Sequence, residues 1–184
     1  MAGLTGVLAG CGASSGGEQQ TNVKTFKREQ NPQRLVELGK GFAGVGDLTR
    51  AEQYFAAAIE QGGDERAIIP MLLRVCVQDG RYRVAIEYAE NFLRKHPNDV
   101  RTRFVLATLY QAVGDAPAAR AQLLRVIDVH PDEAEAHFAL AILMRDSQED
   151  PLVVDRHFRE YLRLKPAGSH AEEAQSSLLK SVPQ

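Results

Sequence analysis

Apolar and small residues recur along this chain at the spacing of a helix face, and the arrangement returns with a fixed period. Within residues 101–113 such positions lie three residues apart, at Phe104, Ala107 and Tyr110, as in an amphipathic helix. A proline closes three such stretches, and these prolines lie 34 and 35 residues apart, at Pro97, Pro131 and Pro166. A period of about 34 residues is typical of a solenoid built from pairs of helices.

The period divides the chain into four units that align almost without gaps. The units are 32–65, 66–99, 100–133 and 134–168. Each has a leucine followed by a small or apolar residue at the same place: Leu38-Gly39, Leu72-Leu73, Leu106-Ala107 and Leu140-Ala141. Each unit therefore predicts one hairpin of two helices.

Glycines mark the turn inside each of the first three units. Gly46, Gly80 and Gly114 follow the first apolar stretch, and glycine takes the left-handed conformation with which many helices end. After Gly114, Asp115 is suited to cap the second helix through its side chain. The fourth unit has the segment 147–151 at this turn, with one residue more. Residues 169–184 predict a capping helix, over 169–182, and a tail.

These positions resemble the pattern of the tetratricopeptide repeat family. The family has small residues where two helices cross closely, here Gly39, Ala107 and Ala141, and again Ala51, Ala85 and Ala119. The tryptophan that the family carries near the start of each repeat is replaced by Leu35, Ile69, Arg103 and His137. The resemblance implies an all-α, right-handed superhelical solenoid of four helical hairpins plus a C-terminal capping helix.

The resemblance also implies a concave groove lined by the first helix of each repeat. Carried onto this chain, its positions are Lys40, Met71, Arg74, Arg101, Phe104, Thr108, Gln111, Phe138 and Ile142. An aromatic anchor beside arginine is typical of protein-binding hot spots, although each phenylalanine can instead pack on a neighbouring helix. The lysine, asparagine and arginine set with which chaperone-type members clamp a C-terminal carboxylate is missing. We therefore expect a protein partner of another kind in this groove.

The first 31 residues differ in composition from the repeats. Leu8-Ala9-Gly10-Cys11 resembles a bacterial lipobox, and residues 12–20 are rich in glycine and serine, as flexible linkers are. We expect 1–10 to be a lipoprotein signal segment, Cys11 the lipidated residue, and 11–31 the anchor and linker. Gly12 in place of an aspartate implies the periplasmic side of the outer membrane. A signal peptide requires positive charge near its start, but no Lys or Arg precedes Cys11. The alternative is therefore an incidental cysteine in a cytoplasmic protein.

Composition and motifs argue against chemistry of the chain's own. The chain has 22 basic and 24 acidic residues and a net charge of −2, without the concentrated basic stripe that nucleic acids require. The segment 39–44 matches G-x-G-x-x-G, but no predicted strand precedes it as in a dinucleotide site. None of the five histidines lies at zinc-ligand spacing, and Cys76 falls on an inward-facing position. We expect no enzymatic activity, cofactor, metal or nucleic acid.

Basic residues gather around the turns of the second repeat. They are Arg81, Arg83, Arg94, Lys95, Arg101 and Arg103. Two interpretations stay open: a solvated face balanced by Glu87, Glu90 and Asp99, or a docking patch for an acidic partner.

The hypothesis is a non-catalytic scaffold held at the outer membrane by lipid on Cys11. Small tetratricopeptide lipoproteins resemble the pilotins that help to assemble secretins of type IV pili or secretion systems, and also scaffolds of motility complexes. Fold alone does not determine function, so two alternatives remain. One is a soluble cytoplasmic adaptor, and the other is an accessory module of an envelope protease or cell-wall enzyme complex.

Overall fold

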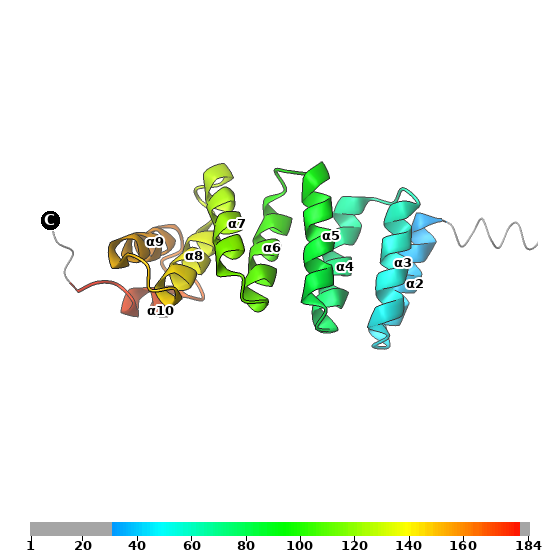
Figure 1. Cartoon of the computed structure of the whole chain (residues 1–184), viewed down its shortest axis with the longest axis horizontal. Helices are drawn as coiled ribbons and strands as arrows, with labels where there is room; N and C mark the ends of the chain where they lie inside the picture. Colours follow the sequence, from blue (N-terminus) through cyan, green and yellow to red (C-terminus); the bar gives the residue numbers. More distant parts are fainter. Residues whose placement is uncertain (1–30, 181–184) are drawn as a thin grey trace, which may run out of the picture.

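The computed structural model describes residues 31–180 of the chain. These residues form nine helices and no strand, labelled α2 to α10 in Figure 1. The helices are α2 (Pro32–Gly44), α3 (Leu48–Glu60), α4 (Glu65–Gln78), α5 (Tyr82–Lys95), α6 (Val100–Ala112), α7 (Ala116–Val129), α8 (Ala134–Asp146), α9 (Pro151–Leu164) and α10 (Ala171–Ser176). Within this part of the chain, no helix is both long enough and apolar enough to cross a membrane. The predicted signal segment, Cys11 and the linker lie outside the described residues.

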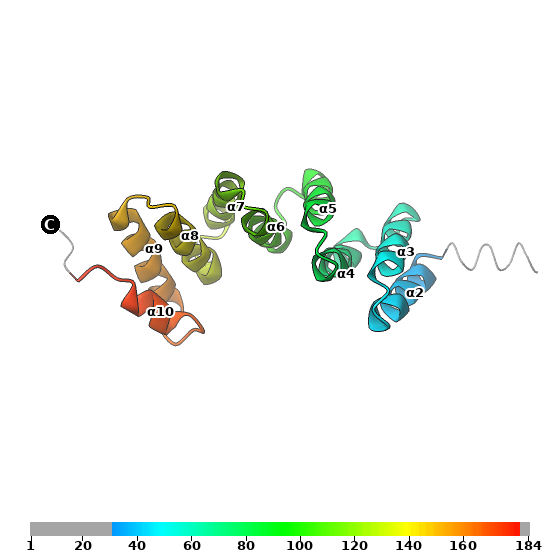
Figure 2. The same cartoon turned by 60° about the horizontal axis from the view of Figure 1, so that its bottom comes forward.

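The helices pack in pairs, and the pairs follow one another along a single axis (Figure 1). Each helix packs against the helices before and after it in the chain, so the contacts are those of a solenoid. In the turned view, α4 and α6 lie on one side of α5 and α7 (Figure 2). The predicted all-α solenoid of four hairpins is confirmed.

The turn inside every hairpin has the same hydrogen bonds. Gly46, Gly80 and Gly114 have φ angles of 80°, 71° and 79°, as predicted for a left-handed helix end. The N–H of the residue after each glycine donates a hydrogen bond to a carbonyl in the last turn of the preceding helix. Asp115, for example, donates to the carbonyl of Tyr110 at 2.9 Å. This pairing is the Schellman motif. The fourth hairpin forms the same motif around Gln148, whose φ is 56°.

Aspartate side chains cap most of the helices. Asp115 accepts a hydrogen bond from the N–H of Ala118 at 3.0 Å, which confirms its predicted role. Asp47, Asp64, Asp99 and Asp150 accept equivalent bonds at the starts of α3, α4, α6 and α9. Helices α5, α8 and α10 differ, because their N-cap residues Arg81, Glu133 and His170 make no side-chain cap bond.

Small residues allow the helices to cross closely. Ala51, Ala85 and Ala119 are fully buried, and a methyl group on Gly39 would lie 2.7 Å from Cε1 of Phe55. Gly39, Gly41 and Gly44 of the dinucleotide-like segment lie inside α2. Of these three, only Gly39 lies at a close helix crossing. Cys76 is also fully buried, and its burial raises the pKa of the thiol to about 12.

The last helix is shorter than the sequence predicts. Within the expected capping segment, α10 covers only Ala171–Ser176. The segment around it is held to α9 by two bonds: the N–H of His170 donates to the Tyr161 hydroxyl at 3.0 Å, and the N–H of Leu179 donates to Asp155 at 2.8 Å. These contacts cover the end of the array, as a terminal cap must.

Candidate protein-binding groove

A hollow of about 430 Å³ lies between α4 and α6, at the middle of the array. Its walls are mostly apolar, since Leu73, Val77 and Val105 line it together with Leu109. Three of the predicted groove residues lie here, namely Arg74, Arg101 and Thr108. The structure therefore brings together predicted positions that lie 34 residues apart in the chain.

The charges at this hollow have one sign. Arg74 and Arg101 line it, and none of the described lining residues is acidic. Within residues 31–180, neither guanidinium has a carboxylate partner at ion-pair distance. Two unpaired arginines beside an apolar surface are complementary to a partner that carries carboxylates next to apolar side chains.

A second hollow, of about 340 Å³, lies between α2 and α4. The predicted residues Lys40 and Met71 line it beside Val36. Lys40 is already paired with Glu37, one helical turn earlier, at 2.9 Å. This end of the surface therefore offers mainly apolar contact.

A third hollow, of about 410 Å³, lies between α6 and α8. Arg101 and the half-buried Phe104 line it, together with Glu133 and Glu135. Arg101 therefore lines both this hollow and the hollow between α4 and α6. The acidic residues lie only on the α8 side. The surface changes from basic to acidic along the array.

The predicted groove residues of the fourth repeat lie in different surroundings. Phe138 is only 8% exposed, because the His170 ring stacks on it with centroids 4.1 Å apart and the rings of Tyr161 and Phe158 pack beside it. Ile142 is half-buried and packs against the C-terminal core cluster. Gln111, from the third repeat, is half-buried and lines none of the hollows described above. We therefore place the accessible groove on α2, α4 and α6.

Tyr82 is a lining residue that the repeat pattern did not predict. It is the first residue of α5, is 36% exposed and lines the hollow between α4 and α6. The sequence feature that could have indicated Tyr82 is an aromatic residue just after the helix-ending glycine turn, at a position where the repeat pattern has no aromatic residue. Tyrosine supplies both apolar area and a hydroxyl, a combination enriched at interfaces.

The structure also brings two histidines together that the spacing did not connect. Nδ1 of His137 on α8 lies 3.0 Å from Nδ1 of His157 on α9, and Nε2 of His137 lies 3.0 Å from the carbonyl of Pro131. Burial, with repulsion from His137, lowers the pKa of His157 to about 4. Among the described residues no three His, Cys, Asp or Glu side chains gather as a metal site would require.

Comparisons with known proteins support the family that the repeat resembles. Residues 77–143 match the family model described as tetratricopeptide repeat, which supports that family for this segment. No match to a curated protein was found.

Solved structures extend this likeness over most of the chain. The first is YrrB, described as a TPR protein with an unusual peptide-binding site, at 16% identity and a TM-score of 0.67, covering 86% of this chain and 88% of YrrB. A tetratricopeptide repeat protein from Parabacteroides merdae gives 19% identity and a TM-score of 0.71, covering 79% of this chain and 58% of that protein. MamA from Desulfovibrio magneticus RS-1 gives 18% identity and a TM-score of 0.64, covering 83% of this chain and 89% of MamA. At such identities the likeness concerns the fold.

Proposed function

We propose that this protein is a non-catalytic adaptor that binds a segment of a partner protein on the surface of α2, α4 and α6. The observation that carries the proposal is the apolar hollow between α4 and α6, flanked by the unpaired Arg74 and Arg101. The peptide-binding site named for YrrB, a protein of similar fold, supports it.

The hollow favours a partner segment of particular composition. Apolar side chains of the partner fill the space beside Leu73 and Val105, and carboxylates on either side pair with Arg74 and Arg101. Arginine is suited to this role because its planar guanidinium binds a carboxylate with two parallel hydrogen bonds. Glu133 at the next hollow repels a continuous acidic run, whereas Glu135 there is already paired with Lys165 at 2.9 Å. The carboxylates of the partner therefore concentrate at one end of the segment.

Affinity capture with a charge-reversal variant tests this proposal. We expect a partner that cross-links to the wild type to be lost with the variant Arg74→Glu, Arg101→Glu, because two attractive contacts become repulsive. The matched control is Arg34→Glu, Arg83→Glu, which changes two exposed arginines outside the groove by the same charge. Recovery of the same partner by all three proteins, quantified by mass spectrometry, would refute binding in the groove.

We further propose that the adaptor acts at the bacterial outer membrane, anchored through lipid on Cys11. The sequence Leu8-Ala9-Gly10-Cys11 and the glycine- and serine-rich linker after it support this location. The role is then to help assemble an envelope machine, such as a type IV pilus or secretion secretin, or a motility complex.

Intact-mass spectrometry of membrane and soluble fractions tests the anchor. Wild type is expected in the membrane fraction with the mass of residues 11–184 plus lipid, and the variant Cys11→Ser is expected to lose both the lipid and the membrane association. An unprocessed wild-type chain in the soluble fraction would instead establish a soluble adaptor, with its partners in the cytoplasm.

A further inference from the structure

Arg103 on α6 is a buried cation that has no counter-ion among residues 31–180. Arg103 is only 8% exposed. Its Nη1 donates to the amide oxygen of Gln122 at 2.8 Å, and its Nη2 donates to the carbonyl of Pro97. Both acceptors are neutral. A guanidinium has five N–H donors, so Arg103 keeps unused donors as well as an uncompensated charge.

Two further arginines share this place. Arg103 lines a hollow of about 370 Å³ together with Arg94 from α5 and Arg125 from α7. In the described part of the chain none of the three has a carboxylate at ion-pair distance. Glu90 is the one acidic lining residue, and its carboxylate accepts a hydrogen bond from the Tyr110 hydroxyl.

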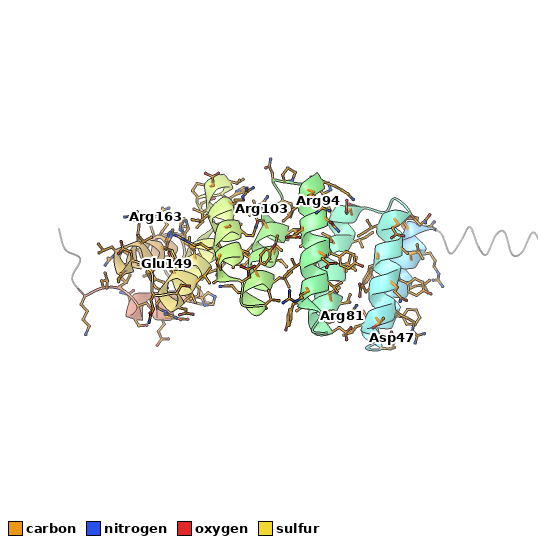
Figure 3. All side chains as sticks on the ribbon, in the orientation of Figure 1. Asp47, Arg81, Arg94, Arg103, Glu149 and Arg163 are labelled. Carbon is orange, nitrogen blue, oxygen red and sulfur yellow. The ribbon has the colours of Figure 1, made fainter. Side chains whose placement is uncertain are left out.

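Electrostatic repulsion accompanies this arrangement. Burial and the neighbouring charge of Arg125 together lower the pKa of Arg103. Buried charges in folded proteins are normally paired. Arg103 is buried and lines the hollow with the exposed Arg94 and Arg125, so the hollow favours an anion. Figure 3 shows Arg94 and Arg103 at one edge of the array, opposite the edge that carries Asp47 and Arg81.

The solenoid itself does not require these arginines. At the equivalent positions one repeat earlier the chain has Glu60, Ile69 and Asn91, and one repeat later it has Asp128, His137 and Glu160. The positive cluster therefore belongs to this hollow alone among the equivalent sites compared. The hollow also shares no lining residue with the groove between α4 and α6.

We propose that the hollow formed by Arg94, Arg103 and Arg125 binds a phosphate group. A phosphate has several acceptor oxygens and up to two negative charges, which matches three guanidinium groups offset by the single carboxylate of Glu90. Arg103 is held in place by Gln122 and Pro97, and the exposed Arg94 and Arg125, which line the same hollow, supply further donors.

Phosphate binding by the purified chain tests the site. The variant Arg94→Gln, Arg125→Gln removes two exposed ligands and keeps Arg103, whose loss would also break the bonds to Gln122 and Pro97. The matched control Arg34→Gln, Arg83→Gln changes the net charge equally. At constant ionic strength, isothermal titration with inorganic phosphate should give the wild type and the control the same dissociation constant and the variant one at least about tenfold weaker.

A thermal melt in phosphate provides the second readout. Phosphate should raise the melting temperature of the wild type and the control but not of the variant, because a ligand that binds only the folded state stabilises it. Circular dichroism establishes that all three proteins are equally helical. Equal phosphate affinity in all three, or no binding to the wild type, would overturn the proposal.

A vesicle experiment distinguishes the source of the phosphate. Wild type and variant are sedimented with vesicles of phosphatidylcholine alone and with vesicles that also contain phosphatidylglycerol. Binding to the acidic vesicles that depends on Arg94 and Arg125 assigns a lipid headgroup to the site. Phosphate binding without vesicle binding assigns the phosphate group of a soluble compound.

Discussion

At the scale of single residues, Gln148 departs from the repeat most clearly. Among residues 31–180 it is the one residue other than glycine with a positive φ, at 56°, and it stands where the other hairpins have Gly46, Gly80 and Gly114. A side chain in the left-handed conformation costs about 1 kcal/mol or more. We expect Gln148→Gly to stabilise the protein by about 1 kcal/mol in urea unfolding, and Gly114→Ala to destabilise it by a similar amount. A loss of stability in Gln148→Gly would contradict this account.

His157 makes the fourth hairpin sensitive to acid. Its pKa of about 4 in the folded protein lies below the ordinary value of 6.5, so the unfolded chain takes up a proton first as the pH falls. Stability should therefore decrease from about pH 6.5 towards pH 4. The variant His157→Gln, which introduces the residue found at Gln122 in the preceding hairpin, should lose less stability between pH 7 and pH 4.5. The exposed His130→Gln serves as control, and an unchanged pH slope in His157→Gln would contradict the prediction.

At the scale of an element, α2 contains two glycines whose surroundings are opposite. A methyl group on Gly39 would meet the Phe55 ring, whereas nothing lies within 4 Å of one on Gly41. Alanine favours a helix over glycine by about 1 kcal/mol, so Gly41→Ala should stabilise the protein by up to that amount. Gly39→Ala should be destabilising, because overpacking outweighs the gain in helix propensity. Thermal unfolding of the two variants gives the comparison, and equal shifts would mean that α2 and α3 do not cross as closely as described.

At the scale of the whole molecule, each hairpin is stabilised mainly by its neighbours. A chain ending at Lys165 loses the bonds from His170 to Tyr161 and from Leu179 to Asp155, and it uncovers Phe138. Because stability in a repeat array is a sum of local terms, we expect amide hydrogen exchange to accelerate in α8 and α9 while α2 to α5 keep their protection. Uniform acceleration along the array would show that the molecule unfolds as one unit.

The repeat pattern alone was sufficient to predict the hairpins, their turns and the cap at Asp115. Gly114 and Asp115 show the reason, because both act within one turn of the helix that they end or begin. The fourth hairpin departs from the glycine pattern, because Gln148 adopts the left-handed conformation in place of glycine. The length of α10 was overestimated, because a short terminal helix depends on its docking to α9 more than on its own apolar positions.

The candidate sites were predictable only in part. Arg74, Arg101 and Thr108 could be assigned to one surface from the repeat register, but the covering of Phe138 depends on His170, 32 residues further along the chain. Likewise Arg94, Arg103 and Arg125 come from three helices, and only packing places them around one hollow. The sequence by itself thus determined the helical period, the closely crossing positions and the turns, since these act over a few residues. The tertiary structure decided which side chains stay exposed and which charges stay unpaired, because both depend on neighbours that are distant in the chain.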